Sequence, residues 1–122
     1  MRELRGDAHI AAMTAEGLTG CEALLLHAGT GEIAARVLQS SRQWPDDEWA
    51  AHADGLRSRG WLDDAGALTE RGWQHRRWVE DRTDELATFA YEPLGDDGCA
   101  RLRAICRPMS QAIVAGGELG FR

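Results

Sequence analysis

Residues 56–72 of this chain read LRSRGWLDDAGALTERG, and they decide the fold. Gly60 stands where a helix can end, because glycine readily adopts the positive φ that such an ending needs. Residues 64–66 are turn formers, and the hydroxyl of Thr69 can cap a following helix. We therefore expect a helix, a tight two-stranded turn and a second helix in that order.

The pattern of apolar residues on either side of this stretch predicts six helices in all. The expected ranges are 2–16, 20–28, 31–39, 45–59, 70–90 and 97–115. Thr30 is expected to cap the third helix, and Pro45 to open the fourth. This order of elements predicts a mainly α protein, a winged helix-turn-helix with a short two-stranded wing.

A length of 122 residues indicates one domain. We expect an N-terminal helix in residues 1–17, the helix-turn-helix and wing in residues 18–68, and a long helix followed by a C-terminal helix in residues 69–122. The last helix carries apolar residues along one face that so small a chain cannot easily cover, so we predict a two-fold homodimer. These residues are Cys99, Leu102, Ile105, Cys106, Met109 and Ile113.

The distribution of charge bears on nucleic acid binding. The chain has a net charge of -6, and residues 43–66 carry six acidic side chains against two arginines, which leaves -4 in the segment that would meet DNA. DNA affinity rests largely on Lys and Arg that neutralise phosphates, so this segment disfavours DNA binding. Asp46, Asp47 and Glu48 also fit a structural reading, since carboxylates in the first turn of a helix favour its dipole.

Composition and spacing exclude several other classes. There is no apolar run long enough to span a bilayer and no secretory signal, so we expect a cytoplasmic protein without a membrane partner. Cys21, Cys99 and Cys106 show no CxxC spacing and are expected to be free thiols rather than disulfides or zinc ligands. Neither a phosphate loop nor a cofactor fingerprint occurs, and we expect no metal and no cofactor.

Two further patterns carry a family resemblance. The motif LTERG at 68–72, followed by VEDRTD at 79–84, resembles the MarR-type winged-helix regulators, and the match covers residues 18–90. RGDAH at 5–9, GCEAL at 20–24 with His27-Ala28, and GWL at 60–62 are similar to the C-terminal half of an uncharacterised actinobacterial family, whose members usually carry another helical half in front. The resemblance implies a winged-helix fold. The resemblance to MarR-type proteins also implies a cleft for aromatic ligands between the winged helix and the dimerising helices. The short wing and the acidic fourth helix depart from the MarR pattern.

Polar residues of the first two helices form one candidate site. These helices pack together in the predicted fold, so His9 and His27 can meet, with Arg5, Asp7 and Glu22 nearby. A histidine held by a carboxylate beside an arginine can bind an anion or act as an acid and base. In the alternative reading, Asp7 caps its helix, His27 is a core histidine and Arg5 forms a surface ion pair.

Tryptophan is the other unusual feature, with five in the chain. We expect Trp49, Trp61, Trp73 and Trp78 to line the ligand cleft, where indoles offer large flat contacts. Indoles are also common core fillers in small domains, and that alternative stays open.

Three classes of function follow. The one we favour is a winged-helix protein that does not read DNA and binds a small, aromatic molecule or a protein partner, as an accessory protein or enzyme of small-molecule biosynthesis. The second is a MarR-type DNA-binding regulator, in which Ser40, Ser41, Arg42 and Arg57 contact the duplex. The third is an enzyme that uses the two histidines and the aspartate of the first candidate site, without a recognised nucleophile motif.

Overall fold

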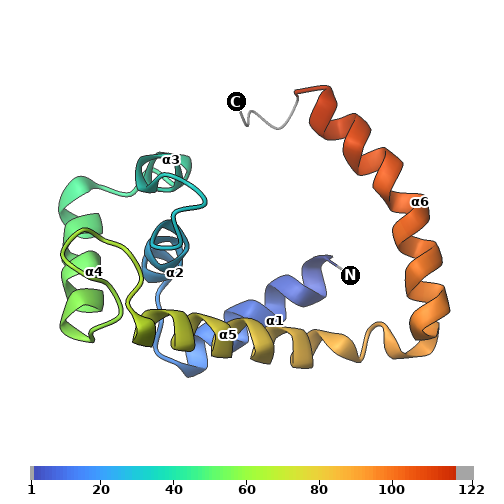
Figure 1. Ribbon diagram of the computed structural model, residues 1–122, viewed down its shortest axis with the longest axis horizontal. Coiled ribbons are helices and arrows are strands. Elements are labelled where there is room, and N and C mark those ends of the chain that lie inside the picture. Colours follow the sequence, from blue (N-terminus) through green and yellow to red (C-terminus); the bar gives the residue numbers. More distant parts are fainter. Residues whose placement is uncertain (1, 118–122) are drawn as a thin grey trace. The chain divides into compact units, whose positions relative to one another are not determined.

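The computed structural model describes residues 2–117 and is mainly helical (Figure 1). The elements are α1 (Arg2–Ala15), α2 (Gly20–Ala28), α3 (Ala35–Ser41), α4 (Asp46–Ser58), α5 (Glu70–Thr88), the 3₁₀ helix η1 (Glu92–Leu94) and α6 (Gly95–Ala115). The chain divides after Leu86 into two compact units. The first holds α1 to α4 and most of α5, and the second holds η1 and α6. Within the described part of the chain, no helix is both long and apolar enough to cross a membrane.

Three local predictions for residues 56–72 are confirmed: the end of a helix near Gly60, the turn before Leu68 and the Thr69 cap. Gly60 follows α4 with a φ of 70° and Gly66 lies in the turn with a φ of 83°. The hydroxyl of Thr69 accepts a hydrogen bond from the backbone N–H of Gly72 at 3.1 Å and donates one to the carbonyl of Gly60 at 2.6 Å. Thr69 therefore caps α5 and ties its start to the end of α4.

The predicted two-stranded wing is reduced to a tight turn. Leu62 and Leu68 form a single antiparallel bridge, and residues 2–117 contain no strand. The bridge is flanked by hydrogen bonds from the N–H of Asp63 to the carbonyl of Ala67 and from the N–H of Thr69 to the carbonyl of Trp61. The pairing cannot extend further because α4 ends at Ser58 and α5 begins at Glu70. We call residues 62–68 the wing turn.

Helix boundaries agree with the sequence prediction except at α3. This helix begins at Ala35, four residues later than expected, and Ala34 provides no side-chain cap. The Thr30 hydroxyl donates to the carbonyl of His27 at 2.8 Å and accepts from the N–H of Glu32 at 3.2 Å. Thr30 therefore stabilises the turn after α2 rather than the start of α3.

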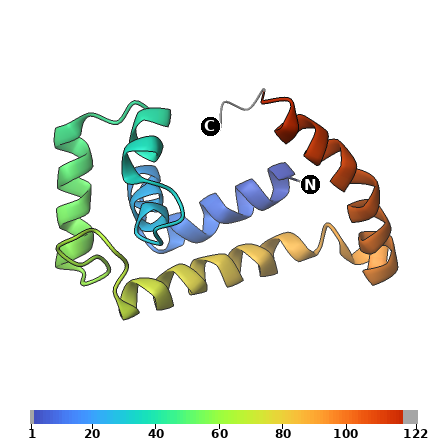
Figure 2. The same ribbon diagram turned by 45° about the horizontal axis from the view of Figure 1, so that its top comes forward.

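The core of the first unit lies where α1, α2, α4, the wing turn and α5 come together. Its buried residues are Ala12, Leu18, Cys21, Leu25, Leu26, Ala53, Leu56, Leu62, Leu68 and Val79. Helix α2 contacts both α3 and α4, and α1 lies alongside α5 in both ribbon views (Figures 1 and 2). This packing brings polar residues of α1, α2 and α5 to one surface.

Candidate functional site

A groove of about 550 Å³ lies between α1, α2, α5 and the segment that joins α3 to α4. We call it the basic groove, because three arginines and one glutamate lie on it. Its polar lining residues are Arg5, His9, His27, Arg42, Arg76 and Glu80, and its apolar ones include Met13, Ala23, Leu24 and Trp44. All of them belong to the first unit.

Ion pairs fix the edge of this groove between α1 and α5. The guanidinium of Arg5 lies 2.8 Å from the carboxylate of Glu80 and 3.0 Å from that of Asp84. The hydrogen bond with Glu80 raises the pKa of Arg5 although burial opposes the rise. For Glu80, burial raises the pKa, but the hydrogen bond from Arg5 and the charges of Arg76, His9 and Arg5 outweigh it and the pKa is lowered. Both groups therefore stay charged near neutral pH.

His9 is held by a buried hydroxyl. Its Nδ1 lies 3.1 Å from the Oγ1 of Thr83, and that hydroxyl donates its own hydrogen to the carbonyl of Val79 at 2.7 Å. The hydroxyl oxygen must then accept from His9, so Nδ1 carries the proton and Nε2 is the basic nitrogen of the neutral ring.

The structure brings only part of the predicted histidine site together. His9 and His27 line the same groove, with Arg5 on its edge. The Nε2 of His27 lies 3.7 Å from the carboxylate of Glu32, beyond hydrogen-bond distance. Asp7 is exposed and is not among the lining residues, so the described contacts place no aspartate on either histidine. The catalytic roles of these residues stay a prediction.

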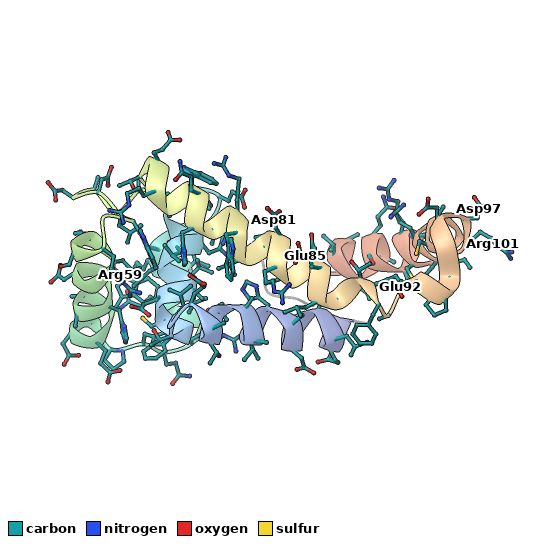
Figure 3. The ribbon with its side chains drawn as sticks, turned by 90° about the horizontal axis from the view of Figure 1, so that it is seen from below. Arg59, Asp81, Glu85, Glu92, Asp97 and Arg101 are labelled. Atoms are coloured by element: carbon teal, nitrogen blue, oxygen red, sulfur yellow. The ribbon has the colours of Figure 1, made fainter. Side chains whose placement is uncertain are left out.

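Glu22 lies elsewhere, inside the fold. Its side chain is buried, with 6% of the residue exposed, and it accepts a hydrogen bond from the N–H of Thr19 at 2.8 Å. Its other carboxylate oxygen pairs with Arg59, which lies at the end of α4 (Figure 3). Glu22 thus completes a capping box at the start of α2 and joins α2 to α4.

The tryptophans lie on several different surfaces. Trp44 lines the basic groove, whereas Trp49 lines a second groove described below. The indole of Trp61 stacks on the ring of His75, with 3.8 Å between the ring centroids. Trp73 and Trp78 are 40% and 44% exposed. Of the four indoles predicted for one cleft, Trp49 lines a described groove, and the cleft itself stays a prediction. The sequence prediction did not include Trp44.

His75 is a further titratable group, and its side chain is only 11% exposed. Its Nε2 is buried without a hydrogen-bond partner in the described part of the chain. Burial lowers the pKa of His75, and the positive charge of Arg59 lowers it further. The carboxylate of Glu16, which lies 3.7 Å from Nδ1, acts to raise the pKa but does not outweigh burial. Because the folded protein binds this proton less readily than the unfolded chain, His75 opposes folding as the pH falls below its ordinary pKa.

The residues proposed for DNA contact are mostly engaged within the protein. The hydroxyls of Ser40 and Ser41 donate to the carbonyls of Val37 and Leu38, at 3.1 and 2.7 Å. Arg57 is paired with the carboxylate of an exposed aspartate at 2.7 Å. Arg42 lies on the basic groove. This arrangement leaves α4 and the wing turn as an acidic surface.

Comparison with known families places the chain in a helix-turn-helix family, whose model matches residues 1–120. The protein belongs to that family. The helix-turn-helix part of the sequence prediction is thereby confirmed, and the likeness to MarR-type and actinobacterial proteins stays a prediction. No curated protein and no solved structure matches the chain.

Proposed function

We propose that this helix-turn-helix protein binds a small organic anion with a flat, apolar body in the basic groove. The observation that carries the proposal is the charge of the groove. Arg5, Arg42 and Arg76 stand against the carboxylates of Glu80 and Asp84, which leaves one excess positive charge in a protein of net charge -6. The volume of about 550 Å³ is that of an ordinary ligand pocket. Met13, Leu24 and the indole of Trp44 supply apolar contacts for the body of the ligand.

Two of the three arginines are suited to hold the anion. Arg5 is already neutralised by two carboxylates. The guanidinium of Arg76 lies 3.7 Å from Glu80, and Arg42 is exposed and has no ion pair among the residues that the structure describes. A guanidinium offers two parallel N–H donors that match a carboxylate or sulfonate. We therefore assign the charged end of the ligand to Arg42 and Arg76.

The first test compares two probes with the same aromatic body, 2-naphthoate and the neutral 2-naphthalenemethanol, by isothermal titration calorimetry. Naphthoate is expected to bind at least about tenfold more tightly, because only the acid can pair with the arginines. Replacing Arg42 and Arg76 together by Gln should weaken naphthoate binding by about tenfold or more.

The matched control replaces Arg101 and Arg103 of α6 by Gln, which removes the same charge from the second unit (Arg101 is labelled in Figure 3). This control should bind naphthoate as the unmodified protein does. Equal affinity for acid and alcohol, or equal losses in the two double variants, would show that the basic groove is not an anion site.

We propose in addition that α6 pairs with the α6 of a second copy. The described side chains of α6 are all at least partly exposed, including Ile105, Met109 and Ile113 at 62%, 55% and 49%. Cys99, Leu102, Cys106, Met109 and Ile113 follow each other at alternating spacings of three and four residues, which is the spacing of a helix-pairing seam. A second copy would cover this seam.

Light scattering should then give a mass of twice 13.4 kDa at micromolar concentration. Ile113→Asp should produce monomers, since it places a charge in the seam. Gln111→Asp adds the same charge to the opposite face of α6 and should leave the dimer intact. A mass near 13.4 kDa for the unmodified protein contradicts the pairing.

A further inference from the structure

A second groove, of about 460 Å³, lies between α2, α4 and the wing turn, and we call it the wing groove. Small and apolar residues make up nearly all of its lining. They are Leu25, Ala28, Gly29, Gly31, Ala35, Trp49, Ala50, Ala53, Leu62, Ala65, Gly66 and Ala67. Leu25, Ala53 and Leu62 belong to the buried core, so the floor of this groove reaches the centre of the first unit.

Small side chains keep the wing groove open. Helix α4 lines it with Trp49, Ala50, Ala53 and Arg57, which lie along one face at helical spacing. Gly29 is packed so closely against the wing turn that a Cβ there would lie 2.9 Å from the Cδ2 of Leu62. The turn is thus seated directly on the end of α2, and the alanines around it leave an apolar hollow that is accessible from solvent.

The surroundings of this hollow are acidic. Arg57 is the one charged lining residue, and its guanidinium is paired with Asp54 at 2.7 Å and donates to the carbonyl of Asp63 at 3.2 Å. Asp54, Asp63 and Asp64 are exposed and adjoin lining residues in the chain. An apolar floor with an excess of carboxylates around it disfavours a phosphate backbone and favours a cation with an apolar body.

We propose that the wing groove docks a segment of another protein that presents an apolar side chain flanked by Lys or Arg. The apolar side chain would fill the hollow between α4 and the wing turn, and the basic residues would pair with the surrounding carboxylates. A groove that takes the apolar face of a helix is a common mode of peptide recognition. This site is separate from the basic groove, so it does not depend on the anion proposed above.

Three labelled peptides of equal length test the proposal by fluorescence anisotropy at about 0.15 M salt. The first is an amphipathic peptide with Leu on one face and Lys on the other. In the second, Glu replaces every Lys, and in the third, Ser replaces every Leu. The Leu–Lys peptide is expected to bind at least about tenfold more tightly than either of the others. Only this peptide offers both an apolar face for the floor of the groove and positive charges for the surrounding carboxylates.

Two neighbouring positions of α4 provide a matched pair of variants. Ala50 lines the wing groove and Ala51 does not, and both are exposed, so Ala50→Arg and Ala51→Arg make the same change inside and outside the groove. Ala50→Arg should weaken binding of the Leu–Lys peptide by about tenfold or more. Ala51→Arg should have a much smaller effect, which separates docking in the groove from general attraction to an acidic surface.

A second pair of variants tests the role of the carboxylates. Asp54→Asn with Asp64→Asn removes two acids beside the groove and should weaken binding and reduce its salt dependence. Asp81→Asn with Glu85→Gln removes two acids from α5 instead and should leave binding unchanged (Figure 3). Equal binding of the Leu–Lys and Leu–Glu peptides, or equal effects at positions 50 and 51, would overturn the proposal. Tighter binding of duplex DNA than of the Leu–Lys peptide at the same salt would identify the surface as a DNA interface and overturn it as well.

Discussion

Gly72→Ala is expected to lower the free energy of unfolding by about 2 to 3 kcal/mol. This is the opposite of the usual effect, because alanine in a helix interior is normally more stabilising than glycine. A Cβ at this position would clash with the carbonyl oxygen of Trp61 and lie 3.0 Å from the Cδ2 of Leu68. The Trp61 carbonyl already accepts the N–H of Thr69 at 3.1 Å, so it cannot move away without loss of that bond. The start of α5 would have to separate from the wing turn.

Urea denaturation of Gly72→Ala and Gly55→Ala measures this effect against a matched control. Gly55 lies within α4, and a Cβ there would meet no atom within 4 Å. Gly55→Ala should therefore be neutral or stabilise by up to about 1 kcal/mol. If Gly72→Ala were as stable as the unmodified protein, α5 would not pack closely against Trp61 and the wing turn at this position.

The parts of the fold that sequence reasoning predicted correctly depend on contacts between residues close in the chain. Gly60 ends α4 and Thr69 caps α5 through groups within a few residues of each other. The same rule was wrong at Thr30, because its hydroxyl bonds backward to His27 and forward to Glu32, and the residue type alone does not decide which turn it serves. The predicted wing strands do not form, because α4 ends at Ser58 and α5 begins at Glu70, which leaves room for the single bridge between Leu62 and Leu68.

The candidate sites depend on contacts that the sequence does not place. His9 and His27 were expected together because their helices pack, and they do line one groove. Arg76 joins them from α5, and no local pattern predicts that contact. Glu22 was predicted to bind a ligand, yet its place three residues after Thr19 fits a capping box, which was the available signal for its structural role. Its partner Arg59 is 37 residues away and follows only from the packing of α4 on α2.

Loss of Arg59 is the second large effect we expect. In Arg59→Ala the buried carboxylate of Glu22 would keep its hydrogen bond from the N–H of Thr19 but lose the ion pair with Arg59. The variant would also lose the contact of the guanidinium with the indole of Trp61, whose ring centre lies 4.6 Å away. Removal of one partner of a buried ion pair costs about 3 to 5 kcal/mol. Because the side chain of Arg59 is 33% exposed, we expect a loss near the lower limit, about 3 kcal/mol.

Arg57→Ala is the matched control for this second prediction, since Arg57 lies two residues away and pairs with an aspartate whose side chain is 74% exposed. Such a surface pair contributes less than about 1 kcal/mol and the 3.2 Å hydrogen bond from Arg57 to the carbonyl of Asp63 about 1 kcal/mol more, so Arg57→Ala should still cost less than Arg59→Ala in urea denaturation. The double variant Glu22→Gln with Arg59→Ala should be more stable than Arg59→Ala alone, because Gln still accepts the Thr19 N–H and leaves no unpaired buried charge. If Arg59→Ala destabilised no more than Arg57→Ala, or if the double variant were the less stable one, the ion pair would not be what joins α2 to α4.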